Sequence, residues 1–265
     1  MTLETVSPAR AAEWLTHNTR NRPLSSTVTL RYAREMRTGL WQNNGDSVRF
    51  SDHGVLLDGQ HRLAAIVETG MTFDMWIGRG FLLSTQLTMD QQKKRTAGDG
   101  LHIEGYASGN KLAACVRMVY RWDTGERSIY GFGGNANHLS LGEVLLILQK
   151  DQDPYQRAVL HVPRFAPGRV VSTLDILTQR VDPERSAVFM TGLMYGADLS
   201  SDSPILTLRN YCERLTAPRG QAPSAGIFLN AGVRAWNAYI HNRSLRVIAY
   251  KGDTIPEIER RKVRK

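Results

Sequence analysis

The 265-residue sequence predicts an α+β protein, in which a small mixed domain precedes a mostly helical one. Short segments of strand character occur at residues 48–57 and 72–77, among helical segments. Further along the chain, apolar residues recur every three to four positions, which is the period of a helix. We therefore expect a mixed domain over residues 1–104, a helical domain over residues 105–258 and a basic tail over residues 259–265.

Two helices are expected before the first strand. Ser7–Leu15 begins with a capping serine followed by Pro8, a residue that is favoured at the first helical position. Ser26–Thr38 has apolar residues spaced by four, and Gly39 ends it. The polar segment between the two helices is expected to be a loop.

The strands of the first domain are short. Val48–Phe50 and Val55–Leu57 are expected to pair as a hairpin, because residues 51–54 have the composition of a turn. A helix is expected over Gln60–Glu68, directly after the second strand. Thr72–Ile77 alternates in polarity and is expected to be a third strand.

The remainder of the chain reads as helical. Ser140–Glu143 has the pattern of a capping box, with a serine followed three residues later by a glutamate. We place the boundary between the two domains in a loop at residues 99–106. Helices are expected at residues 111–122, 140–150, 173–181, 183–195, 204–215 and 226–241.

The net charge of +9 and the isoelectric point of about 9.8 favour a polyanionic partner. Residues 259–265 hold five Lys or Arg against one acidic residue, so nearly half of the excess lies in this tail. Such a tail fits a nucleic-acid arm or a solvated end. DNA is therefore an expected partner, although the charge alone does not require it.

The sequence also indicates where the protein works. No apolar run approaches the roughly 20 residues of a membrane span, and the first ten residues do not resemble a signal peptide. Cys115 and Cys212 lie far apart among apolar neighbours, so we expect two buried, reduced thiols. We expect a cytoplasmic protein with no membrane partner.

The turn Asp58-Gly59-Gln60-His61-Arg62 carries the strongest chemical signal. Backbone N–H groups at a helix start attract anions, and Gly59 permits close approach to the backbone. Arg62 is placed to fork onto phosphate oxygens, and His61 offers a second donor or an acid–base group. Asp58 is suited to cap the helix or to hold a divalent cation. The alternative is an ordinary strand–turn–helix connection with an exposed first turn.

The segment from Leu40 to Gly70 resembles the signature of the ParB N-terminal/sulfiredoxin-like superfamily. Gly59, His61 and Arg62 match its Gly-x-His-Arg turn residue for residue. The resemblance covers about residues 5–98 and implies a phosphate-binding role for Gly59, Gln60, His61 and Arg62.

That superfamily includes CTP-binding DNA-segregation clamps, sulfinic-acid reductases that use ATP, small-molecule kinases and proteins classed as nucleases. Two features argue against the first two classes. Gln60 stands where sulfiredoxins have a cysteine, so reductase chemistry is not expected. Residues 140–150 do not form a convincing helix-turn-helix, so a standard partition protein is not expected either.

Further phosphate contacts are expected from two other segments. Asn21 and Arg22 lie in the polar loop at residues 18–23, which we call the early loop. In this superfamily the residues of such a loop contact nucleotide. The alternative for Asn21 and Arg22 is a capping loop. Lys93, Lys94 and Arg95 are consecutive cations after the last strand, and the alternative for them is a solvated helix start or loop.

We therefore expect a nucleotide-dependent phosphotransferase or NTP hydrolase that uses ATP or another NTP with Mg²⁺ and acts on or with DNA. In this interpretation Asp58 assists the metal or the acceptor, and His61 stabilises developing charge. Arg62→Ala is expected to abolish nucleotide binding and to leave the fold intact. The alternatives are a non-catalytic, nucleotide-gated DNA-binding regulator and a metal-dependent nuclease.

Overall fold

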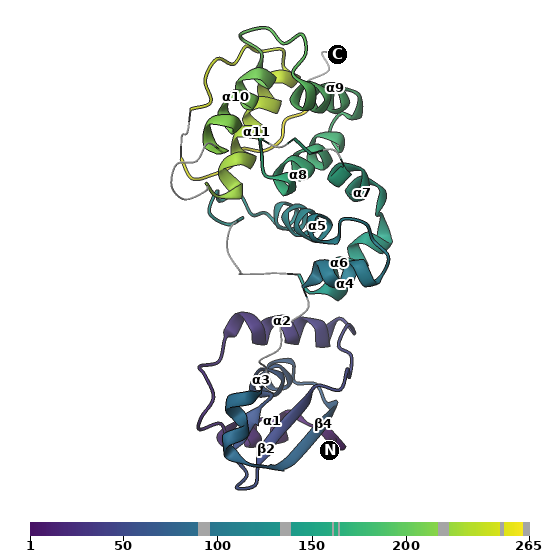
Figure 1. The fold of residues 1–265 in the computed structure, drawn as a ribbon, viewed down its shortest axis with the longest axis vertical. Coiled ribbons are helices and arrows are strands. Elements are labelled where there is room, and N and C mark those ends of the chain that lie inside the picture. The colour runs from purple at the N-terminus through teal and green to yellow at the C-terminus, as the bar shows by residue number, and fades with distance from the viewer. Residues whose placement is uncertain are drawn as a thin grey trace. The chain divides into compact units, whose positions relative to one another are not determined.

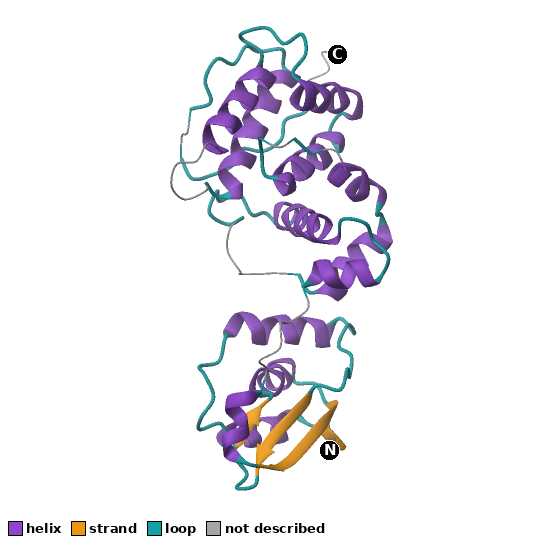
Figure 2. Ribbon diagram, viewed as in Figure 1, coloured by secondary structure: helices purple, strands orange, loops and turns teal. Residues whose placement is uncertain are grey.

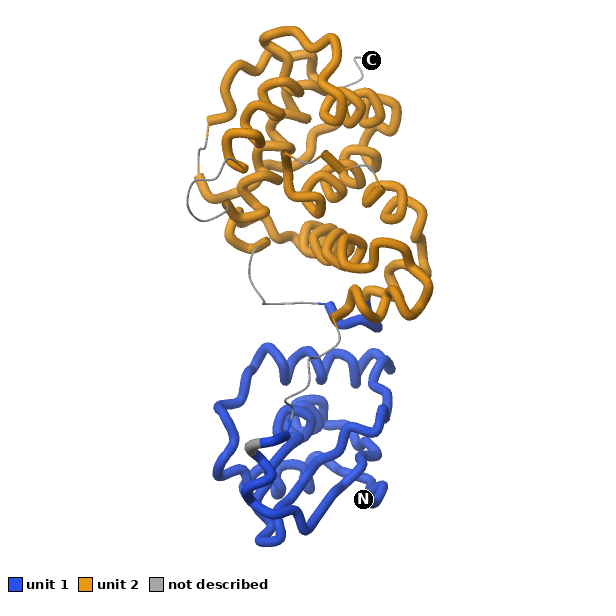
Figure 3. Tube along the Cα trace, viewed as in Figure 1, with its two compact units in different colours: residues 1–94, 136–143 blue, residues 95–135, 144–265 orange. Residues whose placement is uncertain are grey.

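The computed structural model describes residues 1–89, 96–132, 139–160, 162–163, 165–216, 223–249 and 252–261. The chain divides into two compact units (Figure 3). Unit 1 comprises residues 1–94 and 136–143, and unit 2 comprises residues 95–135 and 144–265. The expected α+β class with a helical C-terminal part is confirmed (Figure 2). No helix among the described residues is both long and apolar enough to cross a membrane.

Unit 1 is built on a four-stranded mixed sheet with the order β1-β4-β2-β3 (Figure 1). The strands are β1 (Thr2–Val6), β2 (Ser47–Ser51), β3 (Leu56–Asp58) and β4 (Phe73–Phe81). The predicted β2–β3 hairpin is confirmed as an antiparallel pair, and β2 pairs with β4 in parallel. The strand β1 was not predicted, since its five residues pair with a strand about 70 positions away.

Three helices accompany the sheet: α1 (Pro8–Thr16), α2 (Ser26–Arg37) and α3 (Gln60–Thr69). All three confirm the sequence prediction within two residues. Ser7 caps α1 as expected, because its side chain accepts a hydrogen bond from the Arg10 N–H at 3.3 Å. A short 3₁₀ helix, η1 (Leu83–Thr88), follows β4.

A single hydrophobic core joins these helices to the sheet. Trp14 of α1 meets Phe50 of β2 edge to face, with ring centroids 5.2 Å apart. Leu63 and Ile66 of α3 are fully buried in the same core, beside Met36 of α2. The start of α3 is thus fixed against β2 by apolar packing along the rest of the helix.

Beyond residue 96 the described chain is helical, apart from one isolated bridge between Ser128 and Thr254. The loop expected at residues 99–106 is wrong, because Ala97–Ile103 forms helix α4. Two glycines weaken the helical pattern of this segment in the sequence. Thr96 and Asp99 form a capping box at its start. The other helices are α5 (Gly109–Asp123), α6 (Leu141–Lys150), α7 (Asp153–Leu160, also not predicted), α8 (Gly168–Gln179), α9 (Pro183–Tyr195), α10 (Pro204–Thr216) and α11 (Ala225–Ile240).

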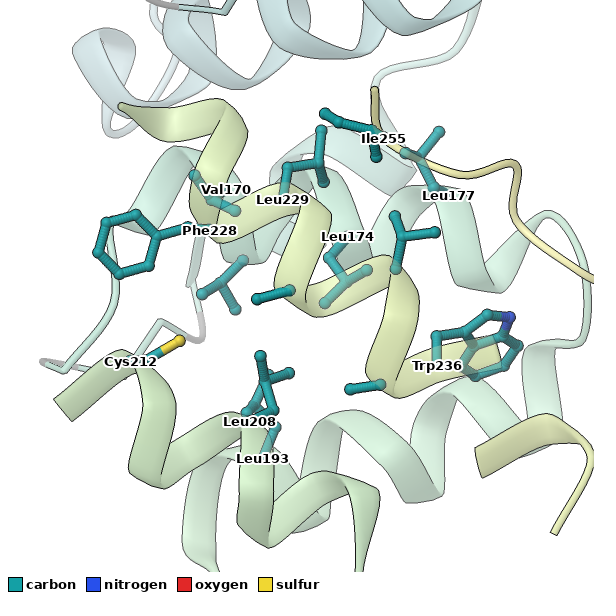
Figure 4. Packing of buried hydrophobic residues seen from close by; sticks show 14 of the residues in the cluster. Val170, Leu174, Leu177, Leu193, Leu208, Cys212, Phe228, Leu229, Trp236 and Ile255 are labelled. Atoms are coloured by element: carbon teal, nitrogen blue, oxygen red, sulfur yellow. The ribbon is translucent and has the colours of Figure 1, made fainter. Parts of the chain in front are cut away.

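The core of unit 2 is built around α11, in which 13 of 16 residues are buried. Figure 4 shows Leu229 and Trp236 of this helix among side chains of α8, α9 and α10. Trp236 is fully buried and meets Phe189 edge to face at 5.5 Å, so its role is structural. Cys115 and Cys212 are buried free thiols, as predicted.

The C-terminal tail differs from the prediction at its first residue. Glu259 was expected to belong to the basic tail, as part of a nucleic-acid arm or a solvated end, but its backbone N–H donates to Asn237 Oδ1 at 2.9 Å. Its carbonyl accepts from Trp236 Nε1 at 3.2 Å. The chain is therefore held on α11 as far as Glu259, and residues 262–265 lie outside the described part.

Candidate functional site

Gly59 forms the corner between β3 and α3 and has a conformation that other residues rarely adopt. Its φ is +96° and its ψ is 5°, which is the left-handed region. A Cβ at this position would lie 2.9 Å from Val48 Cγ2 and 3.1 Å from Val48 Cα. The turn therefore requires glycine for two reasons: the backbone conformation and the close approach to β2.

The first turn of α3 receives no side-chain cap from the described residues. The N-cap residue is Gly59, which has no side chain, and Asp58 before it accepts a hydrogen bond from the Gly59 N–H at 2.6 Å. The backbone N–H groups at a helix start have no partners within the helix, and the dipole makes this end positive. The start of α3 is thus electrostatically suited to an anion.

Arg62 lies one turn into α3 and is engaged on two sides. Its Nη2 donates to the Ser47 carbonyl at 2.7 Å and lies 3.1 Å from Asp58 Oδ2. Its Nη1 lies 3.4 Å from Asp46 Oδ2, a carboxylate that is 67% exposed. The guanidinium therefore ties the helix start to β2 and to two carboxylates.

One nitrogen of the Arg62 guanidinium lacks a hydrogen-bond partner among the described residues. This nitrogen is Nε, which is buried. The side chain as a whole is only 10% exposed. A buried donor without an acceptor costs about 1–3 kcal/mol, so a group that supplies an acceptor here would stabilise the turn.

Gln60 fixes the early loop onto the turn. Its Oε1 accepts from Asn18 Nδ2 at 2.8 Å, and its Nε2 donates to the Arg22 carbonyl at 3.0 Å. Asn21 Nδ2 donates to the Leu56 carbonyl at 2.7 Å. The structure therefore places Asn21 and Arg22 near the motif through main-chain and amide contacts, and their contact with nucleotide stays a prediction.

The same loop holds a cation that the sequence prediction missed. Arg20 lies between Asn18 and Asn21, and the side chains of Arg20 and Arg22 are both exposed. Neither guanidinium forms an ion pair with a described residue. The sequence offered one indication of Arg20, which is its position in the same polar segment as the candidate Arg22.

His61 is buried and makes a defined hydrogen bond. Its Nε2 accepts from the Ser25 backbone N–H at 3.0 Å, at the N-cap of α2. An imidazole nitrogen that accepts a hydrogen bond carries no proton, so this bond requires Nε2 to be unprotonated. This bond gives His61 a structural role between α2 and α3, and Nε2 has no proton to donate to a reacting group.

The remaining candidates are the three consecutive cations after the last strand. Lys93, Lys94 and Arg95 lie outside the described residues. Gln86, in η1 just before them, donates through Nε2 to Asn21 Oδ1 at 3.1 Å. The helix η1 is thus bound to the same early loop.

No group of three or more His, Cys, Asp or Glu in the described part of the chain could hold a metal ion. Asp58 and Asp46 nevertheless share a partner, since both carboxylates contact the Arg62 guanidinium. Mg²⁺ commonly binds one or two carboxylates together with substrate phosphates. The two aspartates do not form a metal site by themselves, because both are already paired with Arg62.

The thiols do not add a nucleophile to this chemistry. Burial raises the pKa of Cys115 to about 12, and it raises the pKa of Cys212 to about 12 as well. A thiol with such a pKa is almost wholly protonated near neutral pH and reacts slowly.

Comparisons with models of protein families, with curated proteins and with solved structures gave no match. A function is therefore inferred from the geometry of the turn around Gly59 and from the chemistry of the residues that surround it.

Proposed function

We propose that unit 1 binds the phosphates of a nucleotide, ATP or another NTP, at the start of α3. The buried Arg62 Nε carries the proposal, because it has no partner among the described residues and a phosphate oxygen would supply its acceptor. The uncapped helix start supports it, since the N–H groups and the dipole favour an anion there. Gly59 supports it too, because its left-handed conformation lets β3 lead directly into the start of α3.

The early loop supplies the positive charge that a triphosphate needs. Arg20 and Arg22 are exposed. Gln60 holds the loop that carries them against the turn through two hydrogen bonds. An arginine can bind two phosphate oxygens at once, so this pair would complete the anion site.

The arrangement favours binding over turnover. His61 Nε2 is occupied by a backbone donor, and both oxygens of Asp58 accept hydrogen bonds. We therefore place a nucleotide-controlled binding protein first. In this proposal, nucleotide bound to unit 1 controls DNA binding, and the basic residues 260–265 contribute to the contact with DNA. The reduced thiols support a cytoplasmic location.

A phosphotransferase or NTP hydrolase is the second candidate, and the pair of carboxylates on Arg62 favours it. Asp46 and Asp58 would hold Mg²⁺ between them and the phosphates, in the way that Mg²⁺ is bound by few carboxylates and several phosphate oxygens. Phosphoryl transfer depends mainly on positioning and charge, so it does not require His61 as a base.

A thermal-shift panel tests the proposal. ATP, CTP, GTP and UTP are each added with and without Mg²⁺, and pyrophosphate serves as the probe for phosphate recognition alone. A nucleotide at 100 times its Kd should stabilise the protein by about 2.7 kcal/mol. Phosphate release measured on the same samples separates binding from turnover. If no nucleotide raises the melting temperature, the phosphate assignment of the turn is wrong.

A further inference from the structure

Residues 253–259, near the end of the described chain, form an extended segment that we call the strap. The Ile129 N–H donates to the Asp253 carbonyl at 2.9 Å, and the Ile255 N–H donates to the Arg127 carbonyl at 2.7 Å. Ser128 and Thr254 form an antiparallel bridge between these two bonds. The strap thus adds to the main chain of residues 127–129 as a strand adds to a sheet edge.

Helix α11 holds the other half of the strap by its main chain. Asn237 Nδ2 donates to the Glu257 carbonyl at 2.8 Å, and Asn237 Oδ1 accepts from the Glu259 N–H at 2.9 Å. Trp236 Nε1 donates to the Glu259 carbonyl. One side-chain amide therefore contacts two backbone positions that are two residues apart, as a neighbouring strand would. These contacts would form with any extended chain.

The side chains of alternate residues add selectivity. Ile255 is 1% exposed and belongs to the core of unit 2, where Figure 4 shows it near α11. Glu257 pairs with Arg127 at 2.9 and 3.2 Å. Glu259 lies 2.7 Å from His241 Nε2 and 3.3 Å from Arg243 Nη2. The preferred pattern is an aliphatic residue followed by acidic residues two and four positions later.

We propose that these groups form a peptide-binding slot that accepts the strap of a second copy of this chain. The slot consists of the main chain of residues 127–129 with the side chains of Trp236, Asn237, His241 and Arg243. The strap is the one sequence seen to meet every group of the slot, and a second copy supplies it unchanged. Such reciprocal exchange of a terminal element is a domain swap.

The strap of the same chain has an advantage, because its attachment gives it a high effective concentration at the slot. Exchange between copies is therefore expected when the contact within one chain is weakened. The strap can therefore be weakened in one full-length chain and the slot in another, and the two chains can then be mixed. The test is independent of nucleotide binding, because every group involved belongs to unit 2.

The experiment mixes an acceptor chain with a donor chain. Ile255→Asp makes the acceptor, because its own strap loses the buried aliphatic residue and its slot stays intact. Asn237→Asp makes the donor, because a carboxylate facing the Glu257 carbonyl repels its own strap, while the strap sequence stays intact. Each chain alone should be monomeric in sedimentation, with faster hydrogen exchange at residues 253–259. A 1:1 mixture should form a dimer.

A matched control replaces the acceptor with Val247→Asp, which adds the same charge at a residue that is 69% exposed and outside the strap. This chain keeps its own strap in its slot and should not dimerise with the donor. Ile255→Ala and Asn237→Ala repeat the experiment if either aspartate disturbs the helical signal in circular dichroism. The proposal is overturned if both straps are released and the mixture stays monomeric, or if neither variant releases its strap.

Discussion

Arg62 and Asp58 face each other across the first turn of α3, with Arg62 Nη2 3.1 Å from Asp58 Oδ2. The same nitrogen donates to the buried Ser47 carbonyl at 2.7 Å. An arginine in this position joins a helix start to the neighbouring strand, so it contributes to the fold before any phosphate binds. Predictions about Arg62 must therefore separate stability from ligand binding.

The first prediction is that Arg62→Ala lowers the free energy of unfolding by about 2–3 kcal/mol. Removing one partner of a buried ion pair costs about 3–5 kcal/mol, and the 22% exposure of Asp58 reduces that cost. This revises the expectation that the substitution leaves the fold intact. Urea denaturation of the parent and the variant measures the difference.

Asp58→Asn provides the companion measurement. It keeps an acceptor for the Gly59 N–H and removes the charge, so it should cost less than Arg62→Ala. The double variant should be more stable than the two separate losses predict, because no unpaired charge remains. Additive losses would show that the two side chains do not depend on each other.

The second prediction concerns Gly59, and Gly70 is its matched control. Both are left-handed, with φ of +96° and +69°, but a Cβ on Gly70 meets nothing within 4 Å. Gly70→Ala should cost about 1 kcal/mol from the backbone conformation alone. Gly59→Ala should cost about 2–4 kcal/mol, because the new Cβ also collides with Val48.

A second substitution tests the cause of that difference. Val48→Ala removes the Cγ2 atom that lies 2.9 Å from the added Cβ, so it should recover part of the loss in the Gly59→Ala background. The same substitution alone should destabilise the parent, because Val48 is fully buried. Equal costs at Gly59 and Gly70 would show that β2 does not constrain the turn.

The sequence was sufficient to predict the elements that have local signals. Ser7 before Pro8, and Ser140 before Glu143, predict helix starts from neighbouring residues alone, and both caps are present. The strand β1 has no such signal, because it forms only by pairing with a distant strand. Helix α4 was missed because Gly98 and Gly100 weaken its pattern.

The candidate site was predictable in its position but not in its contacts. The pattern from Asp58 to Arg62 placed a glycine turn and a helix start correctly. It could not reveal that Arg62 turns toward Ser47, or that His61 Nε2 accepts from Ser25, since these partners lie 15 and 36 residues away. Arg20 had no motif of its own and became a candidate only when the loop was seen bound to Gln60.

The third prediction is that Arg22→Ala weakens nucleotide binding about tenfold and leaves the melting temperature of the free protein unchanged. The side chain is exposed, and only its backbone carbonyl contacts Gln60. Hydrogen bonds to charged groups contribute about 1.5–3 kcal/mol, and tenfold corresponds to about 1.4 kcal/mol. Isothermal titration with the nucleotide found in the thermal-shift panel gives the affinities.

Arg214→Ala is the matched control, since Arg214 is an exposed arginine in unit 2. It should bind nucleotide as the parent does. Arg20→Ala should behave like Arg22→Ala. If the early-loop variants and Arg214→Ala all retain the parent affinity, the loop does not contact the phosphates.

The fourth prediction is a loss of stability in acid. The hydrogen bond from Arg79, together with the nearby charges of Arg79 and Arg10, lowers the pKa of Glu4 from 4.5 to about 2. A carboxyl with a lowered pKa in the folded state stabilises the fold above pH 4.5, and this contribution disappears as the pH falls toward 2. Glu4→Gln should therefore cost stability at pH 6 and cost progressively less between pH 4.5 and 2.

Chemical denaturation at a series of pH values compares the parent with Glu4→Gln. Glu13→Gln, which removes an exposed carboxyl on α1, accounts for the change in net charge. A gap between parent and Glu4→Gln that stays constant from pH 6 to pH 2 would contradict the assignment of the low pKa to Glu4.

The fifth prediction concerns the basic tail, which is separated from the strap by the contacts of Glu259. Deleting residues 260–265 removes five cations and keeps the Glu259 backbone bonds to α11. The deletion should weaken DNA binding at low salt. For each phosphate that the tail no longer neutralises, the slope of log K against log salt should become flatter by about 0.9 for duplex DNA.

Gel-shift titrations at several salt concentrations measure that slope for the parent and the deletion. Nucleotide binding should not change, because the phosphate site lies in unit 1. A second deletion that also removes Glu259 separates the two roles of this region. It should release the strap, seen as faster hydrogen exchange at residues 253–258, with no further change in the salt slope, since Glu259 is acidic and contributes no phosphate contact. If the parent protein does not bind DNA at low salt, or if the slope is the same after the first deletion, the tail has no role in binding DNA.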